Sequence, residues 1–482
     1  MHREPDTSDS QAPLVVDLDG TLIRSDILVE SLLLLAKKAP LRMLAATSWL
    51  ARGRAYFKCR IAREVTLDVA TLPYDRDLIA YLESEKQTGR ELVLATGADD
   101  SVAKGVADHL GLFDRVFASD GRTNLSGETK RDRLVAEFQL YGFDYVGDGR
   151  RDRVVCAAAR KAILVHPVRG LRENGEKTTQ IERVLDDPPE RLESYLTALR
   201  PHQWLKNTLV FAPLALDYHL YQPGLLMQAG LAFAAFSLCA SSGYLLNDLL
   251  DLPNDRRHPH KKDRPLASGQ VPPMHGIIGM VVLLLGAIAV ALFLPLPFLG
   301  ALVGYYVLSL VYSFRLKDIV ILDVLALSIL HTLRVVGGAL AVGTTLSSWL
   351  LAFCIFLFFS LALVKRYAEL VLARKIEGFH AHARAYLFED RELLAALGGS
   401  SGYLAALVLG LYIGTRSSHE FLSLYQIFWL DCPLLLYWIT YMWLMAHRGH
   451  MDDDPLVFGL RDRASRTLIL LMGSVFIAAT LL

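Results

Sequence analysis

Three aspartates at the end of a long apolar segment have a spacing that would let them bind one metal ion together. Asp248, Asp251 and Asp255 follow an apolar run over 225–246, and Asn247 precedes them directly. Residues separated by three and four positions share one face of a helix. Carboxylates crowded on one face repel one another unless a cation lies among them, and Mg²⁺ commonly bridges carboxylates to substrate phosphates. The spacing therefore indicates a site for a diphosphate.

A basic loop follows these acids directly. Residues 258–269 include His258, Lys261, Lys262 and Arg264. A metal that bridges carboxylates, together with bases that neutralise phosphate charge, is typical of a phosphate site. The alternative is a solvated acidic loop after a membrane helix. Ionisable residues at a membrane border are more often functional, which favours the phosphate site.

A second pair of carboxylates lies near the start of the chain. Asp17 and Asp19 are separated by one residue and follow the short apolar stretch 14–16. Acids at the carboxyl end of a buried strand lie at the mouth of an α/β sheet, where ligands bind. Asp17 would then be a nucleophile and Asp19 an acid or base. For so short a motif the alternative is a turn capped by an Asp side chain.

Further segments complete the pattern that Asp17 begins. Apolar stretches at 92–95 and 145–146 each end in polar residues, and a lysine lies between them; the polar residues are Thr96, Lys130, Asp148 and Asp152. In this order the motifs resemble those of the haloacid dehalogenase (HAD) phosphatases, closest to the phosphoserine phosphatase type. The resemblance implies that Thr96 and Lys130 contact phosphate. It implies Mg²⁺ held by Asp17, the Asp19 carbonyl and Asp148, supported by Asp152.

Charge separates the chain into two parts. The 482 residues carry 50 basic and 50 acidic side chains, a balance that gives no reason to expect a nucleic acid partner. Charges occur throughout 1–200, whereas 201–482 contains long apolar runs broken by short charged loops. We expect a Rossmann-like α/β HAD domain at 1–190, a linker at 191–200 and a membrane domain after it.

A helical cap is expected at about 23–90, between the first two HAD motifs. Its apolar segments, 27–36 and 41–50, would form a cap core or touch the membrane. We favour a core, because charged residues interrupt both segments and neither reaches a spanning length.

The acidic motif and its basic loop resemble the signature of the UbiA superfamily of membrane transferases. That signature reads NDxxDxxxD, and the match is complete from Asn247 to Asp255. A second acidic segment, 312–323, resembles the second motif of the family. Within the superfamily, several segments resemble the decaprenyl-phosphate phosphoribosyltransferases; they are 200–207, 316–323, 333–338, 364–370 and 452–458.

This resemblance implies a reaction and a set of residues. Phosphoribosyl pyrophosphate would be the donor and polyprenyl phosphate the acceptor, with the diphosphate held by Mg²⁺. The metal would be bound by Asn247, Asp248, Asp251, Asp255 and Asp323, with Asp248 and Asp251 as catalytic residues. Substrates would be bound by Lys206, Asn207, Asn247, Arg264, Lys317, Asp318, Arg334, Lys365 and Arg366.

The apolar runs predict an all-α polytopic domain of about nine transmembrane helices of roughly 17–25 residues each. They lie near 205–222, 225–247, 276–294, 297–314, 319–342, 347–366, 399–415, 423–446 and 466–482. Lys and Arg fall on alternate connections. By the positive-inside rule, these connections, both acidic motifs and 1–200 are expected in the cytoplasm, at a plasma (inner) membrane of bacterial type.

The two halves predict consecutive reactions. The transferase would make polyprenyl phosphoryl-5-phosphoribose, and the fused phosphatase would remove the 5-phosphate, since tethering raises the effective concentration of the intermediate. The product would be a lipid-linked precursor for ribose or arabinose transfer. One alternative is a prenyl diphosphate donor with a HAD domain that acts on an unrelated phosphate. Another is a HAD domain that is not an enzyme and serves as a phospholipid-sensing or docking module.

Overall fold

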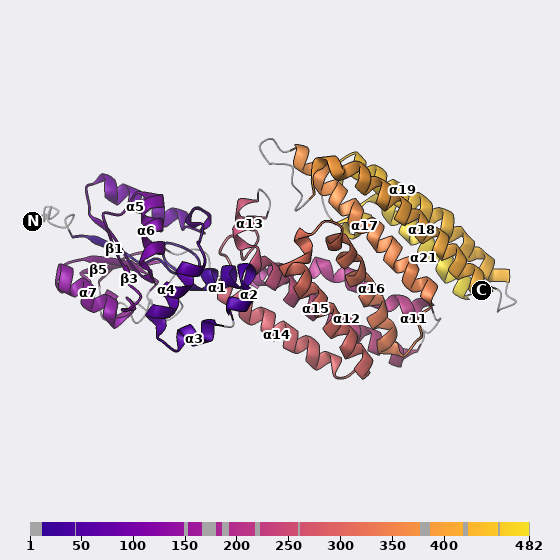
Figure 1. The fold of residues 1–482 in the computed structure, drawn as a ribbon, viewed down its shortest axis with the longest axis horizontal. Coiled ribbons are helices and arrows are strands. Elements are labelled where there is room, and N and C mark those ends of the chain that lie inside the picture. The colour runs from indigo at the N-terminus through magenta and orange to yellow at the C-terminus, as the bar shows by residue number, and fades with distance from the viewer. Residues whose placement is uncertain are drawn as a thin grey trace, which may run out of the picture. The chain divides into compact units, whose positions relative to one another are not determined.

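The computed structural model of this chain describes residues 12–43, 45–148, 153–165, 180–185, 192–216, 222–258, 261–375, 386–417, 423–451 and 454–481. The chain divides into two compact units. The N-terminal unit contains Met1–Leu199 and Leu245–Gly279, and the helical unit contains Arg200–Tyr244 and Met280–Leu482. Figure 1 shows strands with flanking helices in the first and a bundle of long helices in the second.

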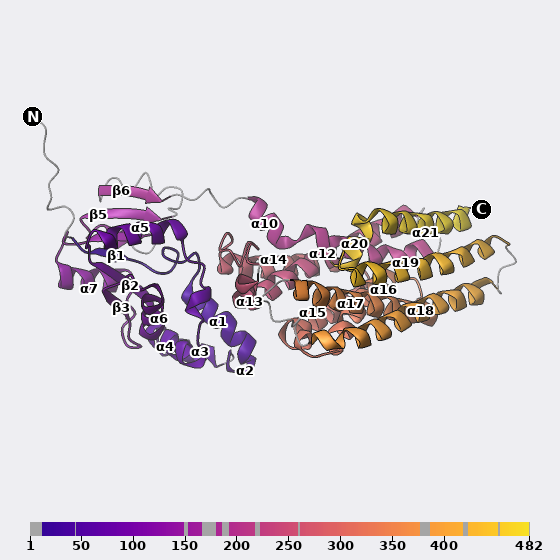
Figure 2. The same cartoon turned by 90° about the horizontal axis from the view of Figure 1, so that it is seen from above.

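A six-stranded parallel sheet organises the N-terminal unit, in the order β3-β2-β1-β4-β5-β6. The strands are β1 (Leu14–Val16), β2 (Leu92–Asp99), β3 (Arg115–Ser119), β4 (Asp144–Gly147), β5 (Lys161–Val165) and β6 (Gln180–Leu185). Figure 2 shows β5 and β6 side by side. Because the chain leaves β1 in one direction and continues from β4 in the other, a topological switch point lies between β1 and β4. The predicted α/β fold is confirmed.

Helices cover both faces of this sheet because its strands are apolar on both sides. On one face, Leu14 and Val16 pack with α5 (Arg76–Gln87) and α6 (Asp100–Leu110). On the other, Val15 packs with residues of α7 (Glu128–Phe138) and α8 (Arg153–Cys156). Alternation along β1 follows from the two-residue period of a strand. The carboxyl ends of the strands remain available for a site.

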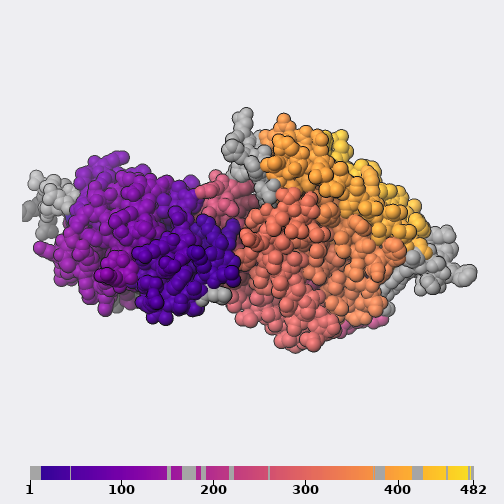
Figure 3. All heavy atoms as spheres, in the orientation of Figure 1, coloured from indigo at the N-terminus to yellow at the C-terminus, as the bar shows by residue number. Residues whose placement is uncertain are grey.

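The cap has a core of its own. It comprises α1 (Ile27–Lys38), α2 (Pro40–Met43), α3 (Ala46–Leu50), α4 (Arg54–Glu64) and η2 (Val69–Thr71). Leu35, Phe57 and Ile61 are buried together there, and Figure 3 shows this indigo part as a closely packed lobe of the unit. The core interpretation of 27–36 therefore agrees with the structure. In contrast, α5, inside the predicted cap range, buries Leu78 and Leu82 against the sheet.

Seven helices among the described residues are long and apolar enough to cross a membrane, so the chain is a multi-pass membrane protein. Four of these spans are the helices α12 (Pro223–Leu250), α14 (Pro273–Ala291), α15 (Leu296–Phe314) and α16 (Leu322–Val342). The other three are Ser348–Leu372, Phe388–Gly414 and Ile427–His447, which lie mainly in α17 (Ser348–Lys375), α18 (Arg391–Ser417) and α19 (Asp431–His447). The shorter elements are α10 (Leu192–Leu199), η3 (Pro201–Phe211), α11 (Ala212–Leu216), α13 (Leu252–Arg257), η4 (Leu316–Asp318), η5 (Phe388–Asp390), η6 (Ser423–Leu430), α20 (Pro455–Arg461) and α21 (Arg463–Leu481).

Two of the nine predicted spans are not among these seven. The described part of the run at 205–222 forms the 3-10 helix η3 and the short helix α11, neither of which is long enough to span a membrane. The run at 466–482 lies in α21, which begins with Arg463 and includes Arg466. The prediction of a polytopic helical domain is confirmed, and nine is an approximate count.

The 3-10 helix η3 lies directly against α16. A Cβ atom at Gly338 would lie 2.1 Å from the Val210 carbonyl oxygen, so only glycine permits this approach. Close packing of the two backbones brings side chains of η3 and α16 together inside the helical unit.

Candidate active sites

The predicted HAD residues meet at the switch point of the sheet. Val16 is paired with Val146, and the Asp17 N–H donates to the Val146 carbonyl at 3.0 Å. Asp17 therefore follows β1 next to the end of β4, after which Asp148 comes. A Cβ atom at Gly20 would lie 3.2 Å from Asp148 Oδ2, so the Asp148 carboxylate lies against the turn after Asp17.

Lys130 contacts Asp17, the candidate nucleophile. Its Nζ donates to Asp17 Oδ1 at 2.8 Å and to the Tyr145 hydroxyl at 3.1 Å. The side chains of Lys130 and Asp17 are 3% and 9% exposed. A buried ammonium at this position can neutralise a phosphoryl group beside Asp17. Tyr145 was not predicted, because a tyrosine in a buried strand has the pattern of a core residue.

Thr96 lies fully buried on β2, where its hydroxyl accepts from the Ala98 N–H at 3.0 Å. A cap residue, Lys58 of α4, reaches the same strand end. Its Nζ donates to the Gly97 carbonyl at 2.6 Å and to Asn124 Oδ1 at 3.0 Å. The sequence held no signal for Lys58, since it is one of many lysines on helices. The structure thus adds a second cation beside the predicted phosphate contact.

Asp19 has the protonation behaviour of an acid–base group. Burial and the nearby Asp26 carboxylate raise the pKa of Asp19 to about 7, against the hydrogen bond that its Oδ1 accepts from the Ile27 N–H at 2.8 Å. A carboxyl group that titrates near neutral pH can donate a proton to a leaving oxygen and later accept one from water. The remaining predicted residue, Asp152, lies outside the described residues.

The first acidic motif also belongs to the N-terminal unit. The Asp251 N–H donates to the Asn247 carbonyl at 3.0 Å, and the Asp255 N–H to the Asp251 carbonyl at 2.8 Å. Helical hydrogen bonding therefore continues from α12 into α13 and keeps the acids on one face, as the spacing predicts. Arg264 Nη1 lies 3.2 Å from Asp248 Oδ1 and 2.6 Å from Asp255 Oδ2.

The donor atoms of this motif fit Mg²⁺. No three His, Cys, Asp or Glu side chains form a metal cage within the part of the chain that the structure describes. However, the buried carboxylates of Asp248 and Asp255 converge on one guanidinium nitrogen, so positive charge already lies between them. Mg²⁺ is usually bound by one or two carboxylates while phosphates and waters complete its shell. Asp17 and Asp148, at adjacent strand ends, offer the same kind of oxygen ligands.

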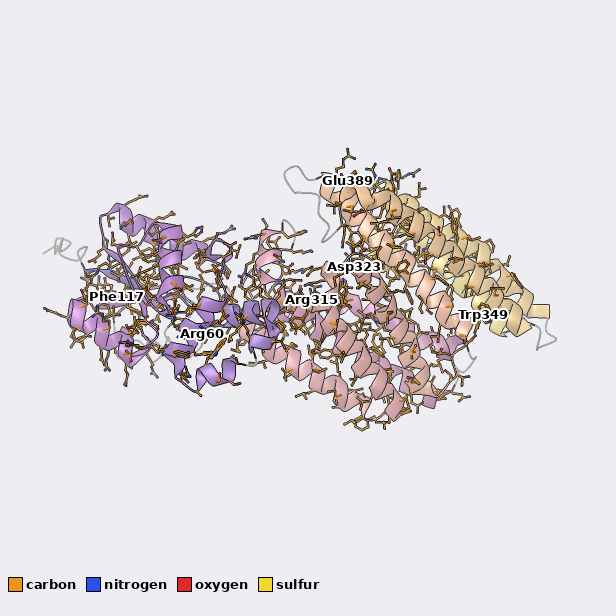
Figure 4. The ribbon with its side chains drawn as sticks, in the orientation of Figure 1. Arg60, Phe117, Arg315, Asp323, Trp349 and Glu389 are labelled. Atoms are coloured by element: carbon orange, nitrogen blue, oxygen red, sulfur yellow. The ribbon has the colours of Figure 1, made fainter. Side chains whose placement is uncertain are left out.

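In the helical unit, Asp323 of the second acidic motif joins three segments. It is labelled in Figure 4, in the helical unit. It is fully buried and accepts from Arg366 Nε at 2.6 Å and from the Tyr386 hydroxyl at 2.5 Å. The Tyr386 hydroxyl also accepts from the Ile321 N–H at 2.8 Å, and Ile321 has a φ of +68° that β-branched residues rarely adopt. These bonds fix the start of α16 against α17. The metal-binding role of Asp323 stays a prediction.

Four of the predicted substrate residues lie in two neighbouring networks of the helical unit. In the first, Lys206 Nζ and Lys365 Nζ lie 2.7 Å and 3.2 Å from Asp454 Oδ2. Burial would raise the pKa of Asp454, but Lys206 and Lys365 outweigh burial and hold it well below its usual range. The first network adjoins the second at Lys206, which directly precedes Asn207 in η3. Asp454 belongs to the segment 452–458, which resembles the phosphoribosyltransferases, but the sequence predicts no role of its own for this residue.

In the second network, Arg334 of α16 is buried among neutral partners. Its Nε donates to Asn207 Oδ1, Nη2 to the Tyr305 hydroxyl and Nη1 to the Leu330 carbonyl, each at 2.8 Å. Asn207 also donates to Ser237 Oγ at 3.1 Å. Arg334 is 3% exposed, and none of these partners carries a negative charge.

His331, one helical turn before Arg334, has a hydrogen-bonding atom without a partner. Its Nδ1 lies 2.6 Å from the Leu327 carbonyl, and because a carbonyl oxygen only accepts, Nδ1 carries the hydrogen. In a neutral ring Nε2 is then an acceptor, and it is buried without a hydrogen bond in the described structure. Sequence reasoning missed His331, since a single histidine in an apolar helix is more often a core residue.

The other two predicted substrate residues of the second motif differ in exposure. Lys317 is buried in η4, and the adjacent Asp318 is exposed. Of the predicted substrate residues, Lys206, Asn207, Arg334 and Lys365 lie together in the two neighbouring networks. Arg366 lies apart from them, in the network of Asp323.

Sequence comparison gives several relatives. A Sinorhizobium fredii protein, y4nM, is 34% identical over 484 residues, covering 98% of this chain and 92% of the relative. The nodulation protein NoeC of Azorhizobium caulinodans is 34% identical over 59% of this chain and 93% of its own length. A decaprenyl-phosphate phosphoribosyltransferase of Mycobacterium tuberculosis is 36% identical over 201 residues, which is 40% of this chain and 66% of the relative.

Solved structures resemble each half at low identity. A UbiA homologue from Archaeoglobus fulgidus, bound to GPP and Mg²⁺, is 17% identical with a TM-score of 0.46, over 60% of this chain and 100% of that one. A substrate-bound phosphoserine phosphatase is 14% identical with a TM-score of 0.26, over 37% and 93%. The model of the UbiA prenyltransferase family matches residues 208–462, more than half of the sequence. The chain belongs to the UbiA prenyltransferase family.

Proposed function

We propose that the membrane domain transfers 5-phosphoribose from phosphoribosyl pyrophosphate to a polyprenyl phosphate, and that the N-terminal domain removes the 5-phosphate from the product. The similarity to the mycobacterial phosphoribosyltransferase supports the choice of donor and acceptor. The meeting of Asp17, Lys130 and Asp148 at one end of the sheet supports a phosphatase.

The observation that carries the proposal is a local excess of cations over carboxylates among the described residues of the helical unit. Lys206, Lys365 and Arg334 are cations in neighbouring networks, and Asp454 is the carboxylate that the two lysines share. An uncompensated charge inside a membrane domain is costly and commonly marks a substrate site. An anionic substrate supplies the missing charge. A neutral aromatic acceptor would leave these cations unbalanced, whereas a phosphate acceptor balances them.

The unpaired acceptor of His331 favours a sugar donor. Burial of a polar atom without a hydrogen bond is unfavourable, so Nε2 is expected to receive a hydrogen from a ligand. A pentose carries hydroxyl groups that donate. The hydrocarbon chain of a prenyl diphosphate offers no such donor.

The transfer needs little more than positioning and charge neutralisation. An oxygen of the lipid phosphate forms a bond to the anomeric carbon, and the bond from that carbon to the diphosphate breaks with its electron pair on the leaving pyrophosphate. The attacking phosphate is already ionised near neutral pH, so no general base is required. Mg²⁺ bound at Asp248, Asp251 and Asp255 would offset the charge of the leaving group. Direct displacement inverts the anomeric carbon, and an α donor then gives a β-linked lipid.

The phosphatase reaction uses the residues at the switch point. An Asp17 carboxylate oxygen attacks phosphorus, and the ribose 5-oxygen leaves with the electron pair and takes a proton from Asp19. Water then attacks the aspartyl phosphate and returns a proton to Asp19, which releases phosphate and restores Asp17. Lys130 and Lys58 stabilise negative charge on the transferring group. The raised pKa of Asp19 suits both proton transfers.

The positive-inside pattern supports a bacterial inner membrane location with both sites facing the cytoplasm. Phosphoribosyl pyrophosphate is a charged cytoplasmic metabolite, so this orientation also gives the donor access to its site.

One reconstitution tests the proposal. Purified protein is incubated with Mg²⁺, polyprenyl phosphate and either phosphoribosyl pyrophosphate or a prenyl diphosphate, and lipid products are resolved by mass. We expect pyrophosphate release and a ribosylated lipid only with the phosphoribosyl donor, and loss of product in Asp251→Ala. Turnover with the prenyl diphosphate and none with phosphoribosyl pyrophosphate would refute the proposed donor. An α-linked product would refute direct displacement.

A further inference from the structure

The phosphatase cap contacts the first acidic motif of the transferase within the N-terminal unit. Three ion pairs connect them. Lys37 Nζ lies 2.8 Å from Asp251 Oδ1, and Glu30 pairs with Arg256. The third pair joins Asp68 and Arg257 at the surface. Each pair has one member in the cap and one in the motif or in α13, the helix that ends it.

The pair of Glu30 and Arg256 anchors this contact. Arg256 donates to both Glu30 carboxylate oxygens, at 2.7 and 2.8 Å, and its Nε donates to the Ala267 carbonyl at 3.0 Å. The side chains of Glu30 and Arg256 are 3% and 7% exposed, and the Ser25 hydroxyl also donates to Glu30. A buried bidentate pair fixes both distance and orientation. Helix α1 is therefore held in one position against α13.

Lys37 lies seven residues after Glu30, two turns further along the same face of α1. Its partner Asp251 is the middle acid of the motif that is predicted to hold the donor diphosphate. The two side chains are 22% and 18% exposed, so solvent reaches this end of the contact. An ammonium has three N–H donors, and Asp251 accepts one of them.

We propose that Lys37 is a binding residue for the donor diphosphate, contributed to the transferase by the cap of the phosphatase domain. The inference rests on the proposed function of the first acidic motif. The ammonium adds positive charge where pyrophosphate leaves, and its remaining N–H groups donate to diphosphate oxygens. The HAD domain thus has a second role besides its own reaction, because it completes the donor site of the other enzyme.

Thermal protection by inorganic pyrophosphate with Mg²⁺ tests this inference without the sugar or the lipid. The full chain in detergent is unfolded at increasing pyrophosphate concentration, and the half-saturating concentration is compared between variants. Lys37→Met should need about 10- to 100-fold more pyrophosphate than the wild type, as expected for loss of a charged hydrogen bond. Lys37→Arg should retain protection, and Asp251→Ala should lose it.

Lys38→Met is the matched control. Lys38 is the next residue on α1, carries the same charge and is exposed, so its replacement should leave protection unchanged. Hydrolysis of p-nitrophenyl phosphate should be equal in Lys37→Met and the wild type, which shows that the cap is folded.

Three outcomes would overturn the inference. They are equal half-saturation for Lys37→Met and Lys38→Met, tighter pyrophosphate binding by Lys37→Met, and no protection of the wild type. The second would show that Lys37 competes with the metal for Asp251. If protection depends on Lys37 but phosphoribosyl pyrophosphate yields no lipid, the proposed function fails and the role of Lys37 stands. If the lipid forms and Lys37→Met behaves as the wild type, only the role of Lys37 fails.

Discussion

Replacement of Arg334 by methionine should lower turnover strongly while it leaves the free energy of unfolding nearly unchanged. Three of the five guanidinium N–H groups donate to Asn207, Tyr305 and Leu330, which leaves two for a substrate phosphate. A hydrogen bond to a charged group contributes about 1.5–3 kcal/mol. Since about 1.4 kcal/mol is a factor of ten, losing one phosphate contact should lower kcat/KM for the lipid product roughly 10- to 100-fold.

Stability without substrate should change little in the same variant. The substitution removes the donor from Asn207, from the Tyr305 hydroxyl and from the Leu330 carbonyl, and each acceptor that stays unsatisfied costs about 1–3 kcal/mol. It also removes a buried cation with neutral partners, and release from desolvation is worth several kcal/mol of opposite sign. We therefore expect the unfolding free energy to change by less than about 2 kcal/mol, from the near cancellation of these terms.

Arg366→Met is the contrasting variant. Arg366 is fully buried and donates to Asp323 and Glu369, so its loss leaves Asp323 as a buried charge and should cost about 3–5 kcal/mol. Thermal unfolding in detergent, followed by tryptophan fluorescence, is measured beside lipid product per folded molecule. If Arg334→Met unfolds as readily as Arg366→Met while its folded fraction turns over normally, Arg334 is a structural residue and the charge-imbalance argument is wrong.

The other predictions concern single groups. Asp17→Asn should stop phosphate release, leave pyrophosphate release intact and accumulate a lipid one phosphate heavier than the final product; the same dephosphorylated lipid at the wild-type rate would contradict the coupled pathway. Lys58→Met should raise the KM for p-nitrophenyl phosphate about 10-fold through loss of a charged contact, whereas an unchanged KM would exclude Lys58 from the phosphate site. Because the pKa of Asp454 is held below its usual range, its ion pairs stabilise the fold above the unfolded-state pKa of about 4 and weaken only as pH falls through the lower folded-state value. Asp454→Asn should therefore lower the thermal midpoint by the same amount at every pH from 5 to 8, and a difference that vanishes by pH 5 would contradict this.

Patterned features were predictable from the sequence, and contacts between distant single residues were not. The helical face of Asp248, Asp251 and Asp255 followed from spacing alone, because helix geometry is local. The approach of Lys130 to Asp17 followed from motif order, because the carboxyl ends of parallel strands meet at one edge of a sheet.

Lys37, Lys58 and His331 could not be found in this way. Each is one residue of a common type in an ordinary helix, and its importance comes from a partner 39 to 214 positions away or from a missing partner. The count of nine spans was approximate for a related reason. An apolar run at 205–222 satisfies the composition of a membrane helix, but its described part up to Phe211 is the 3-10 helix η3, which lies against α16 at Gly338.

The contact between the cap and the acidic motif allows the two fused domains to influence each other's sites, which a flexible tether alone does not. A flexible tether raises the concentration of an intermediate near a second site, but it leaves each site chemically independent. A buried pair of Glu30 and Arg256 instead fixes the cap helix on α13, so a ligand that shifts the cap in the phosphatase site also shifts the acidic motif to which α1 is fixed. Ligands at the two sites should then be coupled in binding, and linkage requires the effect to be reciprocal. A phosphate analogue bound beside Asp17 should change pyrophosphate affinity at the motif by the same factor by which pyrophosphate changes the affinity of the analogue. A factor of one in both directions would show that the two sites are not coupled through this contact, and a factor that returns to one in Glu30→Gln would assign the coupling to it.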